Sequence, residues 1–127
     1  MVADTDVIIR FLTNDDKKKA EAFENYLRAG KSVILTDVTF AEVYWTLRSF
    51  YKFSKPKIIE ILKSLISSKS VLSNRNLLYK TLQILEHTNI SFIDAYLASY
   101  SLVKNEGKVL SYDKGFDKIK QIKRFEP

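Results

Sequence analysis

The chain contains no cysteine and only one histidine, so several kinds of chemistry are excluded at the outset. Without cysteine there is no disulfide, no thiol nucleophile and no thiolate zinc site. The single histidine, His87, rules out a mechanism that needs two histidines of one chain, and we expect it to be structural or incidental. The lack of cysteine also fits a reducing cytoplasm, which is the location we expect.

Glycine and proline are scarce as well, with three and two residues, and no low-complexity tract occurs. Because 46% of the 127 residues are hydrophobic and 13% aromatic, the chain can bury a real core, and we expect one domain over residues 1–127. No apolar run approaches the roughly 20 residues of a membrane span. No basic segment precedes an apolar one at the N-terminus, so we expect neither a secretory signal nor a membrane partner.

Acidic residues are outnumbered by basic ones, 15 to 21, which gives a net charge of +6 and a pI near 9.4. A polyanion such as nucleic acid is the natural partner for a surface of this sign. Charge alone leaves the partner open, because lysine-rich surfaces are common and often bind nothing.

Short apolar runs and segments with helical spacing alternate along the chain. Helices are expected directly after Asp6, at residues 17–28 and 38–51, and from Lys55, Asn74 and Phe92 onward. Strands are expected at residues 1–3, 32–35 and 108–112, at an edge at residues 121–125, and at residues 71–72 unless these form a loop. This alternation predicts an α/β fold with a mostly parallel sheet and helices on both faces.

Four acidic residues occupy comparable places in this pattern. Asp4 and Asp113 each follow a predicted strand, at the end of a sheet where ligands bind in α/β folds. Glu42 is the only acid in a long helix that is apolar nearly all round, unless it lies on a narrow exposed strip. Asp94 lies in the first turn of a helix, where Ser91 and Asp94 also resemble a capping box.

A shared role in metal binding would explain why these acids recur at such places. Four carboxylates brought together would repel one another and raise their own pKa values, and divalent cations remove that conflict. Oxygen-only ligands suit Mg²⁺ or Mn²⁺. Two such ions can clamp the attacking and leaving oxygens of a phosphodiester, while a basic surface holds the rest of the strand.

Four segments of the chain resemble the motifs of PIN-domain ribonucleases. They are Val-Ala-Asp-Thr-Asp at residues 2–6 with Arg10, Thr-Phe-Ala-Glu-Val-Tyr-Trp at residues 39–45, Phe-Ile-Asp-Ala at residues 92–95, and Leu-Ser-Tyr-Asp-Lys-Gly-Phe-Asp at residues 110–117. The nearest kind is the VapC-like toxin of bacterial and archaeal toxin–antitoxin pairs, and the resemblance covers nearly the whole chain. It implies a single PIN-like domain with about five strands flanked by helices, and endoribonuclease activity that depends on Mg²⁺ or Mn²⁺.

The resemblance also implies which residues act and what they meet. The catalytic and metal-binding residues carried over are Asp4, Glu42, Asp94 and Asp113. The implied partners are RNA, a small antitoxin protein and a second copy in a homodimer. An aromatic surface around Tyr44, Trp45, Phe50 and Tyr51 could dock a partner, although core packing is expected for most of it.

Three further residues of these motifs are expected to support the site. Asp6 stands where the family usually has Asn or Ser, and it either adds a fifth carboxylate or caps the following helix. Ser111 and Asp117 belong to the last motif, and Asp117 is expected to be a surface turn residue rather than a further ligand.

Two other functions remain open at this point. Asp4-Thr5-Asp6-Val7 also resembles the first motif of haloacid-dehalogenase-type phosphatases, in which the first Asp is the nucleophile, and Asp113 and Asp117 resemble the acids of the last motif. That alternative leaves Glu42 and Asp94 without a role. The other alternative is an inactive PIN-like domain that only binds RNA or protein.

Overall fold

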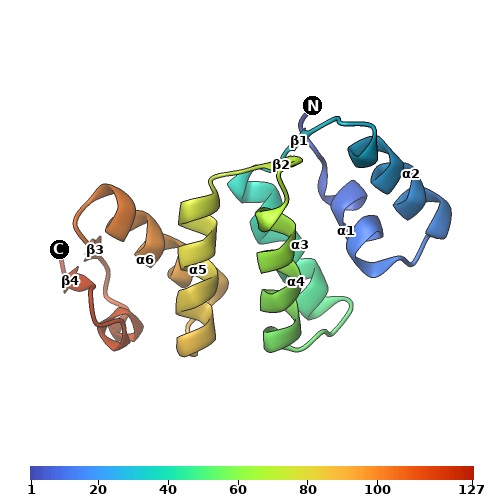
Figure 1. Cartoon of the computed structure of the whole chain (residues 1–127). Helices are drawn as coiled ribbons and strands as arrows, with labels where there is room; N and C mark the ends of the chain where they lie inside the picture. Colours follow the sequence, from blue (N-terminus) through green and yellow to red (C-terminus); the bar gives the residue numbers. More distant parts are fainter. The chain divides into compact units, whose positions relative to one another are not determined.

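The computed structural model describes all 127 residues, and the chain divides into two compact units, Met1–Arg75 and Asn76–Pro127. Six α-helices, one 3₁₀ helix and four short strands alternate along it (Figure 1). The longest helices have 13 residues, and none has both the length and the apolar character needed to cross a membrane.

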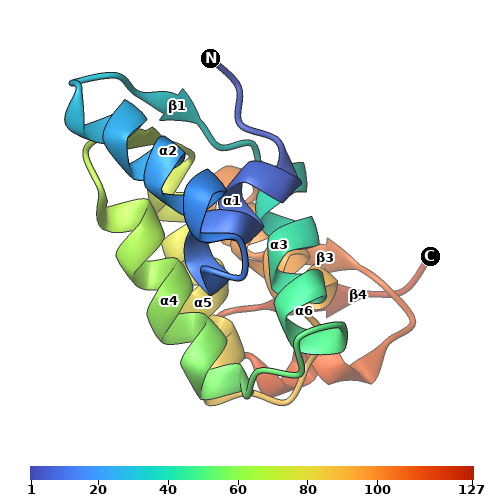
Figure 2. The same ribbon diagram turned by 90° about the vertical axis from the view of Figure 1, so that its right-hand side faces the viewer.

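The first unit is mainly helical. Its elements are α1 (Thr5–Thr13), α2 (Lys17–Arg28), β1 (Val33–Ile34), α3 (Asp37–Ser49), α4 (Lys55–Ser67) and β2 (Val71–Leu72). Helix α1 lies between α2 and α3 (Figure 2), and α3 packs against α4. Strands β1 and β2 pair in parallel, and Val2 adds one parallel bridge to Ile34. The N-terminal residues are thereby tied to β1 just before α1 begins.

Side-chain caps set where the helices of this unit begin. The Asp16 carboxylate accepts a hydrogen bond from the backbone N–H of Lys19 and so caps α2. Ser54 caps α4 in the same way and is followed by Pro56 in the first turn. Such caps satisfy backbone donors that have no partner within the helix. The predicted helix at residues 17–28 is therefore observed with the same bounds.

Helix α3 buries one face and exposes the other. Phe40, Val43 and Leu47 are almost completely buried, whereas Trp45 keeps 65% of its surface exposed. Glu42 also lies on the exposed side. The helix is therefore not buried all round in the single chain, and Glu42 lies on an exposed strip, the alternative that the sequence left open. A carboxylate on that strip can reach solvent and a ligand.

The second unit contains α5 (Arg75–His87), α6 (Phe92–Lys104), β3 (Lys108–Leu110), the 3₁₀ helix η1 (Lys114–Lys118) and β4 (Lys123–Phe125). Ser91 caps α6, as its position in the sequence predicts. Strands β3 and β4 pair in parallel, and α6 contacts β3. One hydrophobic cluster of this unit gathers Ala98, Phe116 and Ile119, with Ile84, Ile90, Val109 and Ile122 packed against it.

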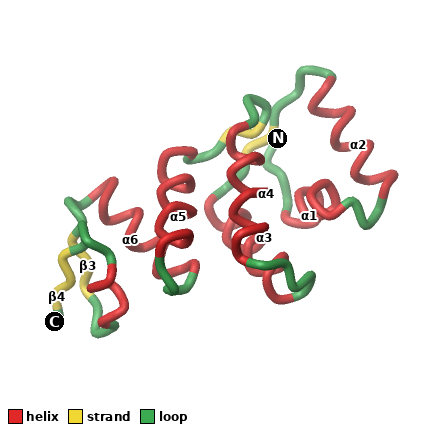
Figure 3. Tube along the Cα trace, turned by 60° about the horizontal axis from the view of Figure 1, so that its bottom comes forward, coloured by secondary structure: helices red, strands yellow, loops and turns green.

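The strands are shorter than the sequence suggests. The α/β class and parallel pairing are as predicted, but the structure shows two separate two-stranded sheets instead of one sheet of about five strands (Figure 3). In β1 and β2 only Val33 and Val71 are buried, whereas Ile34 and Leu72 are largely exposed. Long parallel strands need cover on both faces, and here the helices cover only one side of the pair. The expected single domain over residues 1–127 stays a prediction.

Candidate functional site

Asp4 lies between the parallel β-bridge of Val2 with Ile34 and the start of α1. The backbone N–H of Ala3 donates to the carbonyl of Ile34 at 2.9 Å, and α1 starts two residues later. The Asp4 carboxylate caps this helix by accepting a hydrogen bond from the Thr5 N–H at 2.8 Å. A helix N-terminus favours a negative charge, so Asp4 is held at the helix end with its side chain exposed.

Asp4 and Glu42 line the same pocket. The pocket has a volume of about 380 Å³ and lies between α1, α3 and the residues that follow α3. It is lined by Asp4, Thr5, Asp6, Ile9, Arg10, Glu42, Thr46, Phe50 and Tyr51. Three carboxylates face one guanidinium in this lining, so the pocket carries an excess of negative charge that suits a cation.

Arg10, which lines this pocket, forms ion pairs with two carboxylates. Its Nε lies 3.1 Å from Oδ1 of Asp6, one turn earlier on α1, and its Nη1 lies 2.7 Å from Oδ2 of Asp15. The Tyr51 hydroxyl donates to the same Asp15 oxygen at 2.7 Å. These contacts join α1, the α1–α2 turn and the chain after α3, which are distant in sequence.

The ionisation of this group follows from its contacts. The hydrogen bond from Tyr51 is the main reason that the pKa of the Asp15 carboxyl lies below its ordinary value. The same bond raises the pKa of the Tyr51 hydroxyl. Asp15, and then Asp6, raise the pKa of the Arg10 guanidinium. Around neutral pH the arginine therefore stays charged beside an ionised Asp15.

We expect Tyr51→Phe to raise the pKa of Asp15, because it removes the largest cause of the lowering. A carboxyl with a lower pKa in the folded chain adds stability above its unfolded pKa, and this stability is lost as the pH falls through the folded pKa. The free energy of unfolding of the variant should therefore change less than that of the wild type as the pH is lowered into the acid range. Carbon NMR titration of the Asp15 carboxyl measures the shift, and Tyr112→Phe, at an exposed tyrosine, is the control. An unchanged Asp15 titration would contradict the assignment.

The Asp6 side chain contacts the arginine one turn further along α1. It does not cap α1, because Asp4 does, and its carboxylate is paired with Arg10. The alternative in which Asp6 caps the helix is therefore wrong. Since the Arg10 contact occupies Oδ1, Asp6 acts as a counter-charge that helps to hold the arginine at the pocket.

The other two acids lie in the second unit, each at a helix start. Asp94 is half-buried in the first turn of α6, and its backbone N–H donates to Ser91 Oγ at 3.1 Å. Asp113 caps η1 through a hydrogen bond from the Gly115 N–H to its Oδ1, at 2.8 Å. Its own N–H donates to Ser111 Oγ at 2.9 Å. Ser111 thus supports the turn that carries Asp113.

Asp117 is engaged by an arginine of the last strand. Arg124 Nε lies 3.1 Å from Asp117 Oδ1, and Nη1 donates to the Ser111 carbonyl at 2.9 Å and to Glu126 at 2.8 Å. The hydrogen bond to Glu126, followed by that to Asp117, raises the pKa of the Arg124 guanidinium. Asp117 is therefore a surface residue that holds β4 to the η1 segment.

The donor chemistry of the first pocket fits a hard divalent cation. Proteins often bind Mg²⁺ through one or two carboxylates, with water and substrate phosphates completing the shell. Asp4 and Glu42 provide such a pair. Neither unit by itself gathers three Asp, Glu or His side chains in a group that could hold a metal ion. The shared site of all four acids stays a prediction.

Sequence reasoning missed the partners of Arg10. The motifs assign no role to Asp15, and they place Tyr51 only in an aromatic surface. Tyr51 and Asp15 are 36 residues apart, and no motif links them. Nothing near Tyr51 in the sequence indicates that its hydroxyl donates to a carboxylate.

No curated protein matches the chain. A family model described as the PIN domain matches residues 1–122, which leaves only the last five residues unmatched. The chain, with Asp4 and Glu42 in one pocket, belongs to the PIN domain family.

Proposed function

We propose that the protein is a metal-dependent endoribonuclease that cleaves phosphodiester bonds in RNA, as the toxin of a toxin–antitoxin pair. PIN domains are generally nucleases, which supports a hydrolase that acts on nucleic acid. The observation that carries the proposal is the meeting of Asp4 and Glu42 in one acidic pocket of a PIN-family chain. The family match also removes the basis for a haloacid-dehalogenase-type phosphatase.

Asp4 and Glu42 of the pocket would hold Mg²⁺ or Mn²⁺. Asp94 and Asp113, which do not line this pocket, are proposed as further ligands. When bound by these residues, the cation would supply Lewis-acid chemistry for phosphodiester hydrolysis. Arg10, fixed by Asp6 and Asp15, offsets part of the negative charge that the carboxylates bring to the pocket.

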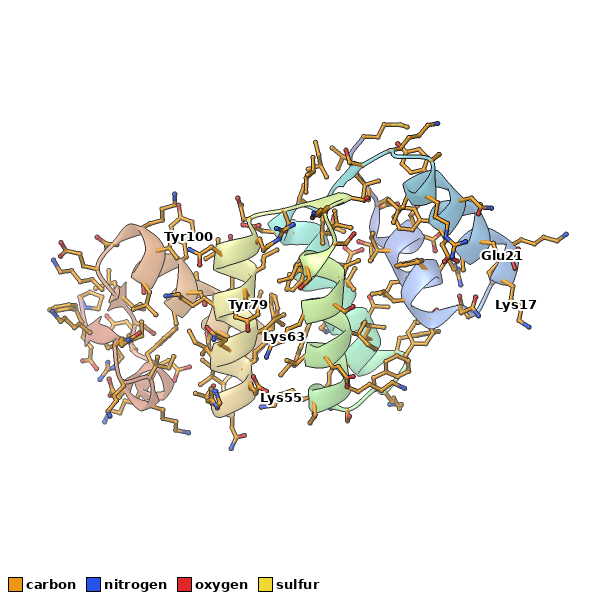
Figure 4. The ribbon with its side chains drawn as sticks, in the orientation of Figure 1. Lys17, Glu21, Lys55, Lys63, Tyr79 and Tyr100 are labelled. Carbon is orange, nitrogen blue, oxygen red and sulfur yellow. The ribbon has the colours of Figure 1, made fainter.

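Exposed apolar side chains support a protein partner as part of this function. On α6 they follow helical spacing at Ile93, Leu97 and Tyr100, the last of which is labelled in Figure 4. Val38 and Trp45 are exposed on one side of α3. Contiguous exposed apolar surface commonly marks an interaction site. We assign the α6 stripe to a second copy in a homodimer and the α3 side chains to a small antitoxin.

Metal removal tests the proposed activity. We expect the protein to cleave a mixture of RNAs when Mg²⁺ or Mn²⁺ is present, to stop when a chelator is added, and to resume when the metal is restored. The products are separated on a denaturing gel, and single-stranded DNA of the same sequence is the control. RNA that stays intact with either metal, or cleavage that a chelator leaves unchanged, contradicts the proposal.

An inactive RNA- or protein-binding PIN domain is the second candidate. It is favoured by one observation, namely that neither unit alone gathers three potential metal ligands. In that case the protein should bind RNA without cutting it, and binding should be unaffected by Asp4→Asn. Metal-dependent cleavage lost in Asp4→Asn excludes this candidate.

A further inference from the structure

A second pocket, contained entirely in the second unit, has a different character from the acidic one. It has a volume of about 400 Å³ and is lined by Lys80, Gln83, Ile84, His87, Thr88, Leu102, Lys118, Ile119, Lys120 and Gln121. No Asp or Glu contributes to this lining. The pocket therefore combines three lysines and one histidine without a balancing carboxylate.

The wall formed by α5 follows from helix geometry. Lys80, Gln83, Ile84 and His87 are spaced three and four residues apart, so they lie on one face of the helix. Two cationic or ionisable side chains and one amide thus project from the same helical face, with an aliphatic side chain between them.

Another part of the lining is the short segment 118–121, which begins at the last residue of η1. It is held by a hydrogen bond from the Ile119 N–H to the Phe116 carbonyl at 3.1 Å. Gly107 also approaches it closely, since a Cβ at that position would lie 2.5 Å from the Gln121 carbonyl oxygen. Backbone contacts therefore fix the positions from which Lys118 and Lys120 project.

The lysines of this pocket are not engaged by other side chains. Arg10, Arg28, Lys108 and Arg124 form ion pairs elsewhere on the chain. By contrast, Lys80, Lys118 and Lys120 form no ion pair and no side-chain hydrogen bond. Gathering unpaired ammonium groups costs free energy through like-charge repulsion, and an anionic ligand removes that cost.

If the anionic ligand is a phosphate of a nucleic acid, the rest of the lining suits the nucleobase next to it. Ile84, Leu102 and Ile119 provide aliphatic surface, and Gln83 and Gln121 carry amides that both donate and accept hydrogen bonds. Small-ligand sites are typically apolar with a few polar groups that fix orientation. Single-stranded RNA is recognised through splayed bases that are hydrogen-bonded on their edges, together with phosphate contacts.

We infer that this pocket is a nucleotide-binding subsite for single-stranded RNA, in which the lysines contact phosphates and the aliphatic surface and amides take one base. The inference rests on the proposed function, because RNA is its substrate. It assigns to the second unit a binding role that the four acids do not supply. An acidic protein segment is the competing occupant, and the experiment below separates the two.

The charge-reversing double variant Lys118→Glu/Lys120→Glu tests the subsite. Binding of a labelled single-stranded RNA of about 12 nucleotides is measured by fluorescence anisotropy, with Asp4→Asn as the common background so that the probe stays intact. We expect the Kd to rise by about 30- to 100-fold, and the slope of log K against log salt to fall in magnitude by about 1.4 for two lost phosphate contacts. Lys118→Gln/Lys120→Gln should weaken binding less, in the same direction.

Lys17→Glu/Lys18→Glu is the matched control, because it changes the net charge equally on α2. Both lysines are exposed, and Lys17 projects from the start of this helix in Figure 4. The inference requires this control to keep its Kd within about threefold of the background variant. Equal weakening by both double variants would show a general charge effect and overturn the subsite.

Two further outcomes separate this inference from the proposed function. If the wild type never cleaves RNA but the pocket variants still lose binding selectively, the nuclease proposal fails and the subsite is supported. If the wild type cleaves RNA and the pocket variants keep both Kd and KM, the subsite is overturned and the nuclease proposal stands. A polyglutamate peptide that binds the pocket while RNA does not would also overturn it.

Discussion

Asp4→Asn is expected to lower the rate of metal-dependent RNA cleavage by about 10³-fold, in line with the loss of a charge-stabilising group at a reaction centre. The substitution removes the negative charge from a residue that lines the same pocket as Glu42. It should leave the fold intact, because asparagine caps helices about as well as aspartate and its amide oxygen can accept from the Thr5 N–H. Initial rates with Mg²⁺ and thermal unfolding measure the two effects separately.

Asp16→Asn is the matched control for this variant. Asp16 caps α2 through the Lys19 N–H just as Asp4 caps α1, and it does not line the pocket. The control therefore makes the same chemical change at the same kind of helix position. We expect its cleavage rate to stay close to that of the wild type. Similar losses in both variants, or an Asp4→Asn enzyme within tenfold of the wild type, would contradict the role given to Asp4.

Phe40→Ala is expected to lower the free energy of unfolding by about 3–5 kcal/mol, the usual cost of emptying the space of a buried aromatic ring. Phe40 has no exposed surface and lies on the buried face of α3. Because small domains are stable by only about 5–15 kcal/mol, such a loss leaves little margin. Glu42 is two residues further along the same helix, so cleavage should fall together with stability. Urea unfolding monitored by circular dichroism gives the measurement.

Trp45→Ala provides the comparison on the same helix. It removes an even larger aromatic ring, but 65% of the Trp45 surface is exposed. We expect a change within about 0.5 kcal/mol, which is usual for surface positions. If Trp45→Ala destabilised the chain as much as Phe40→Ala, the division of α3 into a buried and an exposed face would be wrong.

The helices could be predicted closely because their signals are local. The bounds of α2 follow from Asp16 at its start and from apolar positions three and four apart. The start of α4 follows from Ser54 and Pro56. In each case a side chain a few residues away supplies the cap, so the sequence carries the whole signal.

The strands could not be predicted to the same degree, because their length depends on cover from distant helices. Residues 32–35 and 108–112 were expected as strands, and only Val33–Ile34 and Lys108–Leu110 are paired. The parallel pairing of β3 with β4 joins segments separated by η1. An apolar run by itself does not show over how many residues it pairs with another strand.

The candidate site was predictable only in part, because its motifs are local in sequence whereas the contacts between them are not. The sequence motifs singled out Asp4 and Glu42, and the structure brings both to one pocket. Asp94 and Asp113 belong to the second unit, so their contribution stays a prediction. The pairing of Tyr51 with Asp15 could not be found, because a hydroxyl–carboxylate contact over 36 residues depends on how α1 and α3 pack.

Arg124 connects the last few residues of the chain to the turn that carries Asp113. One guanidinium holds Asp117, Glu126 and the carbonyl of Ser111, whose hydroxyl in turn accepts from Asp113. A chain cut before Lys123 would keep every acid of the motif, yet it would lose both the arginine and the neighbour of β3. Shortened versions of the chain should therefore retain the final strand.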